Sequence, residues 1–419
     1  MITVFTRHKK KTFLCLFLFI GLFFFVLPKV FSVRYISPTN NSLFGISTST
    51  ISEKEIFIPS YVSTPEAVKG IYMTSWTASS QNLRNALVKL VDDTELNSVV
   101  IDIKDYSGKI VFPISDNSKL KSFGSEEIRI KDLRDFIEEL HQKGIYVIGR
   151  IAVFQDAYFV EYRPDLAVKN KTRELVWKDR KGISWVDPGS REYWDYIILI
   201  TKESRKIGFD EINFDYIRFP SDGNMQDISY PFSSTTAKHL IMKSFFEYLD
   251  SELRDQSELK ISADLFGMVT TAKDDMGIGQ LLEDALPYFD YIMPMVYPSH
   301  YPPTFEGFKE PEAYPYEVVH YAMQQAVQRA NVFENKIAST TNNPVVDFGI
   351  APSEQGTANA KIHYRDKFRP WLQDFGLRMS YGSTEVRAQI NATYDVGLNS
   401  WVLWSPSNKY TATALIKEQ

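Results

Sequence analysis

The sequence predicts an α/β protein whose eight parallel strands close into a (β/α)8 TIM barrel over residues 66–410. Apolar strand-like stretches alternate eight times with stretches of helical periodicity. The strand-like stretches are largely apolar, as in parallel sheets that helices cover. The competing interpretation, an open doubly wound sheet, calls for a glycine-rich phosphate turn after the first strand. The sequence there is TSWTASSQN, which has no glycine.

The expected strands share an apolar centre, and the expected helices carry apolar residues on one face. The strands are Val68–Met73, Ser98–Ile103, Ile145–Phe154, Glu211–Asp215, Leu259–Gly267, Asp290–Pro298, Arg369–Phe375 and Asn399–Ser407. The helices are Leu83–Val91, Leu133–Leu140, Arg191–Gly208, Ala237–Arg254, Ile278–Phe289, Tyr316–Ala330 and Thr384–Gly397. Lys143-Gly144 and Lys206 with Gly208 are typical helix ends, because a cation in the last turn is followed by a glycine.

Four long segments without periodicity follow expected strands, at 106–128, 155–188, 216–233 and 297–314. They fall on the carboxyl-terminal face of the barrel, where barrel enzymes build their active sites. Residues 331–366 lie between a helix and the seventh strand, on the opposite face, and have no place in this scheme.

The N-terminal region predicts export to, or anchoring in, a membrane. Arg7 and Lys9 to Lys11 precede an unbroken apolar run from Phe13 to Leu27. No A-x-A-like cleavage site follows, which favours an uncleaved anchor in residues 1–33 over a cleaved signal. Residues 34–65 are rich in Ser, Thr, Asn and Pro and predict a linker. We therefore expect a single-pass protein of the cell membrane with an extracytoplasmic domain, or a secreted one.

Composition argues against several classes of function. The net charge of −5 gives no basic field for nucleic acid. A single cysteine and six scattered histidines leave no disulfide framework within one chain and no expected metal site or cofactor. Carboxylates are the plentiful catalytic groups. Aromatic residues make up 14% of the chain and provide material for stacking against sugars.

Asp215 ends the fourth expected strand, in GFDEINFDYIRFP. Side chains alternate along a strand, so Asn213 should point into the barrel with Asp215, while Ile212 and Phe214 face the helices. A buried carboxylate needs a partner. Arg218 is close enough in the turn to pair with it or with a neighbouring acid, and such pairing would keep the acid ionised, as suits a nucleophile.

Asp264 holds the same place on the fifth strand, and two acids on neighbouring strand ends suit glycoside hydrolysis. Polar and aromatic residues at other strand ends are expected to bind a carbohydrate substrate, by hydrogen bonds and by ring stacking. This set is Trp76, Asp102, Lys104, Arg150, Asn213, Arg218, Tyr297, His300, Gln373 and Trp404.

The segment DEINFDYI resembles the D-G-x-D-x-D-x-E strand of chitinases only in part. Asn213 replaces one Asp, and Ile217 stands where the catalytic Glu should be. The chitinase mechanism needs that Glu, so the sequence argues against a chitinase.

Residues 67–410 more closely resemble a bacterial family of glycoside hydrolases that is classed as a domain of unknown function. The stretches that carry the resemblance are GIYMTSWTA, VVIDIKDYSG, RIAVFQD, WVDP, FDEINFDYIRFP, ISADLFG, YIMPMVYPSHY, RPWLQDF, VRAQI and WVLWSPSNKY. The family is similar in its barrel to α-amylase-type enzymes. This resemblance implies Asp215 as nucleophile and Asp264 as proton donor, with Asp374 as a substitute donor because amylases use a Glu there.

Two functions are open at this stage. The first is a glycoside hydrolase that acts on extracellular or cell-surface polysaccharide with two carboxylates. The second is a barrel of the cell envelope that binds glycan without cleaving it.

Overall fold

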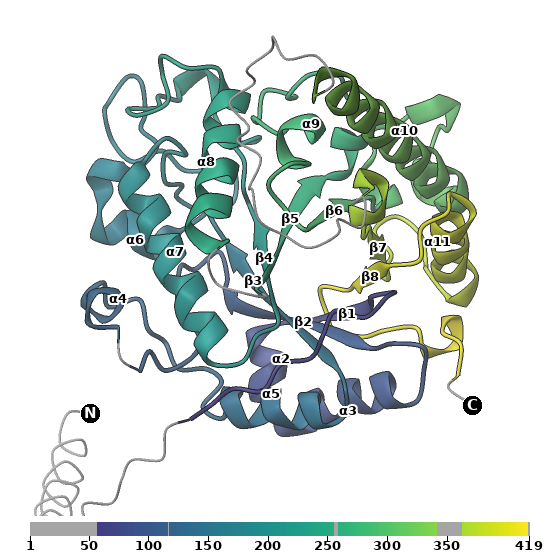
Figure 1. Ribbon diagram of the computed structural model, residues 1–419. Coiled ribbons are helices and arrows are strands. Elements are labelled where there is room, and N and C mark those ends of the chain that lie inside the picture. Colours follow the sequence, from purple (N-terminus) through teal and green to yellow (C-terminus); the bar gives the residue numbers. More distant parts are fainter. Residues whose placement is uncertain (1–56, 116, 255–258, 342–362, 418–419) are drawn as a thin grey trace, which may run out of the picture. The chain divides into compact units, whose positions relative to one another are not determined.

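Figure 1 shows the computed structural model, which describes residues 57–115, 117–254, 259–341 and 363–417. Residues Ile58–Gln419 form one compact unit. The expected anchor in 1–33 and most of the linker lie outside the described residues. Within the described ranges, no helix combines the length and apolarity that a membrane crossing requires.

The eight strands are parallel and form a closed barrel in sequence order, which confirms the predicted (β/α)8 fold. They are β1 (Lys69–Met73), β2 (Ser98–Lys104), β3 (Tyr146–Ala152), β4 (Glu211–Asp215), β5 (Lys260–Phe266), β6 (Tyr291–Met295), β7 (Trp371–Gln373) and β8 (Trp401–Trp404). The closure is made by β8, which pairs with both β7 and β1.

The longer helices surround the barrel (Figure 1). They are α3 (Gln81–Asp92), α5 (Leu133–Gln142), α7 (Arg191–Lys206), α8 (Lys238–Leu253), α10 (Pro315–Thr341) and α11 (Ser383–Asp395). Shorter helices lie in the connections: α2 (Ser75–Ser79), α4 (Ser118–Ser122), α6 (Ala157–Tyr162) and α9 (Leu282–Ala285). The expected helix ends are found, since Gly144 and Gly208 follow α5 and α7 with φ of 73° and 118°.

Two predicted helices differ from those observed. The helix expected at 278–289 is only the short α9, because Gly279 has a φ of 81° before it and Pro287 follows it. The helix expected at 316–330 continues as α10 to Thr341. Residues 331–341 of the unassigned segment are therefore helical, and 342–362 lie outside the described residues.

Alternation along the strands divides the core into two layers. Ile212 and Phe214, as predicted, belong to the large outer cluster between strands and helices. A separate inner cluster fills the barrel and includes Tyr72, Ile148 and Trp371. The inner layer is also polar, since Arg369 pairs with Glu211 at 2.7 Å inside it. Buried charges at this depth must be paired, so the barrel interior is built from ion pairs as well as apolar side chains.

The end of the expected linker packs on the barrel. Ser60 Oγ donates to Glu138 at 2.8 Å, and the backbone N–H of Val62 donates to Asp210 at 2.8 Å. The Tyr61 hydroxyl donates to the carbonyl of Arg205 at 2.9 Å. These contacts lie at the ends of α5 and α7 and the start of β4, so this segment covers the face of the barrel opposite the strand carboxyl ends.

Candidate active site

A cavity of about 360 Å³ opens at the carboxyl ends of the strands. Strands β3 to β8 each contribute a lining residue, and the loops that follow β4, β5 and β6 contribute more. Ligand pockets in proteins commonly span about 300–1,000 Å³. The cavity therefore has room for a small number of sugar units, and it lies where the barrel fold places active sites.

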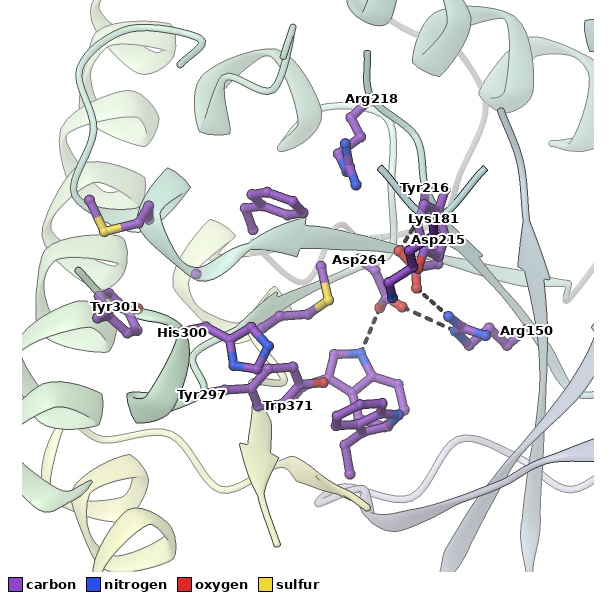
Figure 2. Close-up of a pocket in the computed structure, with 15 residues that line it drawn as sticks. Arg150, Lys181, Asp215, Tyr216, Arg218, Asp264, Tyr297, His300, Tyr301 and Trp371 are labelled. Carbon is purple, nitrogen blue, oxygen red and sulfur yellow. Dashed lines mark hydrogen bonds and ion pairs between the residues drawn. The ribbon is translucent and has the colours of Figure 1, made fainter. Parts of the chain in front are cut away.

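Arg150, on β3, contacts three carboxyl groups, and Figure 2 shows its contacts with Asp215 and Asp264. Its Nη1 donates to Asp102 at 2.6 Å, its Nη2 forms an ion pair with Asp215, and its Nε lies 3.8 Å from Asp264. Burial alone would lower the pKa of Arg150, but the charges of Asp215 and Asp102 more than offset this and raise it. Arg150 thus remains a cation between three carboxyl groups.

Asp264 is held in the floor of the cavity by two donors. Its Oδ1 accepts hydrogen bonds from Asn213 Nδ2 at 2.8 Å and from the Trp371 indole Nε1 at 2.7 Å. Burial and the neighbouring charge of Asp215 raise the pKa of Asp264 well above its usual value. A carboxyl group that keeps its proton towards neutral pH is suited to act as a general acid.

Asp215 is oriented by the turn that ends β4. Its Oδ1 accepts from the backbone N–H of Tyr216 at 2.5 Å, while Oδ2 faces Arg150. Tyr216 has a φ of 52°, a left-handed conformation that bulky residues rarely adopt. This sharp turn at the strand end aims both the carboxylate and the Tyr216 ring at the cavity that they line.

Asp215 and Asp264 contact nitrogens of the same guanidinium, so their carboxyl groups fall within the ~10 Å that two-carboxylate hydrolysis allows. Figure 2 shows both on the same side of Arg150. The two acids differ in environment, because Asp215 has the shorter ion pair with Arg150 and Asp264 is the more deeply buried. Such a division favours one charged and one protonated carboxyl group.

Aromatic rings form another part of the wall. The rings of Tyr297 and Trp404 stack with centroids 5.3 Å apart, and His300 lies 5.4 Å from Tyr297. Burial, then the charge of Arg378, lowers the pKa of His300 and favours its neutral form. A neutral aromatic wall beside carboxyl groups suits a sugar ring, whose C–H face packs on aromatic planes.

Many of the predicted site residues gather here. The cavity is lined by Asp215, Asp264, Arg150, Arg218, Tyr297, His300 and Trp404. Asn213 and Asp102 lie directly behind it, and each contacts a lining residue through a hydrogen bond or ion pair.

The expected pairing of Arg218 with Asp215 is wrong. Arg150 takes that place, and the turn at Tyr216 separates the two side chains. Arg218 Nη1 instead donates to the carbonyl of Phe219 at 2.9 Å and to Ser221 Oγ at 3.1 Å.

Lys104 does not reach the cavity. A shift in the register of β2 and β3 between Asp102 and Lys104 turns the lysine towards α7. There its Nζ lies 2.8 Å from Asp156 and donates to the carbonyl of Ala152 at 2.5 Å, fully buried. The expected role of Lys104 in binding substrate is therefore replaced by a core ion pair.

The remaining three predicted residues also lie away from the cavity lining. Asp374 accepts from the N–H and the hydroxyl of Thr411 at 2.8 and 2.7 Å, so both of its oxygens are engaged outside the cavity. Gln373 is buried and accepts from the N–H of Ser299. Trp76 lies on the surface in α2, 62% exposed, with the Arg129 guanidinium 4.6 Å from its ring.

Sequence reasoning missed several lining residues, including Trp371, Tyr216, Tyr301 and Lys181. The alternation rule could have found Trp371, since it occupies the inward position before Leu372 on β7. Lys181 lies on a long loop, in the 155–188 segment, where no periodic signal marks its direction.

Comparisons with known proteins agree with this architecture. A family model described as "DUF4015: Putative glycosyl hydrolase domain" matches residues 70–346 and 331–410. No curated protein matches the chain. The PgaB (BpsB) glycoside hydrolase domain from Bordetella bronchiseptica aligns with a TM-score of 0.55 and 13% identity, over 84% of this chain and 100% of that one. A hypothetical protein from Ruminiclostridium thermocellum ATCC 27405 is 31% identical with a TM-score of 0.42, over 50% of this chain and 98% of that one.

Proposed function

The chain belongs to the DUF4015 family, whose description is "Putative glycosyl hydrolase domain", and on that premise we propose that its barrel hydrolyses glycosidic bonds with two carboxyl groups. The observation that carries this proposal is the difference in environment between two acids that both contact the Arg150 guanidinium. Asp215 forms the shorter of the two ion pairs with Arg150, whereas Asp264 has a raised pKa. The reaction requires one protonated and one ionised carboxyl group.

Asp264 is the proton donor in this mechanism. Its proton passes to the glycosidic oxygen of the leaving sugar as the bond to the anomeric carbon breaks. Trp371 and Asn213 stabilise the carboxylate that remains, because both donate to its Oδ1.

Asp215 is the ionised partner. It either attacks the anomeric carbon directly or removes a proton from the attacking water. Arg150 and the N–H of Tyr216 orient the carboxylate. The wall of Tyr297 and Trp404 holds the sugar ring by stacking.

We propose a polysaccharide outside the cytoplasm as the substrate. The size of the cavity and its aromatic wall support an oligosaccharide segment as the bound group. The basic residues and apolar run in 1–33 support the location, as an anchored or a secreted protein.

A glycan-binding barrel without hydrolysis is the second candidate. It is favoured by the Arg150 contacts, which reach both acids, and by the 1% exposure of Asp264. In that case the acids would only hold Arg150 in place.

A polysaccharide hydrolysis screen with the full chain separates the two candidates. Wild type and an Asp374→Asn control should release reducing ends. Asp215→Asn and Asp264→Asn should each lose activity by about 100-fold or more, the range seen when an acid–base group is removed. Binding of a glycan by all four proteins without release of reducing ends would establish the binding barrel instead.

A further inference from the structure

Arg218 is a buried cation that lines the cavity and has no acid partner there. It is 8% exposed, and among the described residues it forms no ion pair. Asp215 is occupied by Arg150, and Asp179 accepts from Gln155 and the Trp185 indole. These acids and Asp222 attract Arg218 only at longer range. An unpaired guanidinium at this depth is costly, so its presence calls for a ligand.

The guanidinium of Arg218 is fixed in orientation. It lies 4.8 Å from the ring centroid of Trp185 and 4.6 Å from that of Phe266. Nη1 is held by Phe219 and Ser221, whereas Nε and Nη2 have no hydrogen-bond acceptor among the described residues. Figure 2 shows the group pointing from its backbone towards the middle of the cavity. A planar pair of free donors matches the two oxygens of a carboxylate.

Lys181 adds a second positive charge at the same cavity. It is exposed on the loop that precedes α7, and its N–H donates to Asp179 at 2.9 Å. The charged lining consists of three cations, Arg150, Lys181 and Arg218, against the two acids Asp215 and Asp264. Because Arg150 is already paired with Asp215, the charge of Lys181 and Arg218 is available to a ligand.

We propose that the substrate carries a carboxylate, as a uronic acid unit does, and that Arg218 and Lys181 bind this group. The inference rests on the proposed function, because it names the substrate class of the same cavity. Arg218 supplies two parallel hydrogen bonds, and Lys181 supplies charge at the rim. The aromatic wall of Tyr297 and Trp404 is then left for the ring of a neighbouring sugar.

The first test needs no variant. Binding of the full chain is measured against polygalacturonate, alginate, hyaluronan and glucuronoxylan oligosaccharides, each paired with its carboxyl-reduced form. At least one acidic oligosaccharide should bind about tenfold or more tightly than its reduced form, since charge-assisted hydrogen bonds of this kind are lost on reduction. Equal binding of acidic and reduced forms throughout, or binding of neither, would overturn the inference. A stronger preference for sulfated glycans would also overturn it.

Variants then assign the preference to these two residues. Lys181→Ala should reduce the preference several-fold, whereas Lys178→Ala, an exposed lysine on the same loop outside the cavity lining, should leave it unchanged. Arg218→Lys keeps the charge but loses the paired donors, and should abolish most of the preference in protein that melts as wild type does. A full preference in both Lys181→Ala and folded Arg218→Lys would refute the assignment.

The hydrolase proposal and the carboxylate-binding proposal can fail independently of each other. Hydrolysis of acidic and reduced forms at equal rates would leave the hydrolase proposal intact and remove the carboxylate subsite. Selective binding of an acidic form that is never cleaved would keep the subsite and remove the proposed function.

Discussion

The indole Nε1 of Trp371 donates a 2.7 Å hydrogen bond to Oδ1 of Asp264, so a residue of β7 lowers the proton affinity of an acid on β5. A hydrogen bond to the charged form lowers the pKa of a carboxyl group. Trp371 therefore partly offsets the burial that raises the pKa of Asp264. The pKa of Asp264 stays raised, while the carboxylate that forms when it gives up its proton still has a hydrogen-bond donor.

Trp371→Phe should move the basic limb of the pH profile upwards. Without the indole donor, the pKa of Asp264 rises further, and Asp264 as general acid stays protonated to higher pH. The maximal rate should fall, because the carboxylate formed in the reaction loses a donor. The measurement is kcat/KM against pH, which reports the groups of the free enzyme.

Trp401→Phe is the control for that experiment. Trp401 is also a buried strand tryptophan that donates a hydrogen bond, at 3.1 Å to Tyr394, but it belongs to the outer cluster. The Trp401→Phe variant should have the basic limb of its pH profile at the same pH as wild type. An unchanged limb in Trp371→Phe as well would show that Asp264 does not titrate in the catalytic step.

Asp374→Ala should leave activity within about twofold of wild type and lower stability. The substitution removes two hydrogen bonds from Thr411, which contribute about 1–3 kcal/mol together. Chemical denaturation and initial rates measure the two effects. A loss of activity above 100-fold with unchanged stability would return Asp374 to the catalytic set.

Lys104→Met should destabilise the fold while preserving the rate per folded molecule. Lys104 and Asp156 are fully buried and 2.8 Å apart, and loss of one partner from such a pair costs about 3–5 kcal/mol. Adding Asp156→Asn removes the stranded charge and should recover part of this loss. An unchanged unfolding midpoint with a higher KM would instead support the expected role of Lys104 in substrate binding.

The sequence predicts the barrel well because the barrel depends on repeated, local patterns. Eight apolar stretches with helices between them leave few alternative folds, because the glycine-rich phosphate turn of a doubly wound sheet is missing after the first strand. The strand-end rule also places Asp215 and Asp264 beside one cavity, since both side chains follow the alternation of their strands.

Which side chains pair with those acids depends on strand register and on turn conformation, and local sequence patterns predict neither. The bulge in β2 sends Lys104 outwards, and the left-handed Tyr216 separates Arg218 from Asp215. We expected a seven-residue strand, Arg369–Phe375, but β7 comprises only Trp371–Gln373. The expected strand therefore included Asp374, which lies beyond the observed end. The inward Trp371, rather than Asp374, is the residue that contacts the acid.

Asp264→Asn should make the protein more stable than wild type at neutral pH, with a gain that grows as pH rises. The folded state raises the pKa of Asp264 above its unfolded value near 3.9, mainly by burial. Between these two pKa values the folded protein binds more protons than the unfolded chain. The contribution of this group is therefore fully present below the unfolded pKa and is lost as pH rises through the folded pKa.

Asparagine carries no charge, so the variant escapes that loss while its side-chain oxygen can still accept from Trp371 and Asn213. Urea unfolding of both proteins from pH 4 to pH 8 measures the difference, and Asp366→Asn, at a carboxylate that is 65% exposed, should show none of this trend. A variant that is less stable than wild type by the same amount at every pH would mean that Asp264 is ionised in the folded protein. It would then have no proton to donate, and the assignment of Asp264 as general acid would fail.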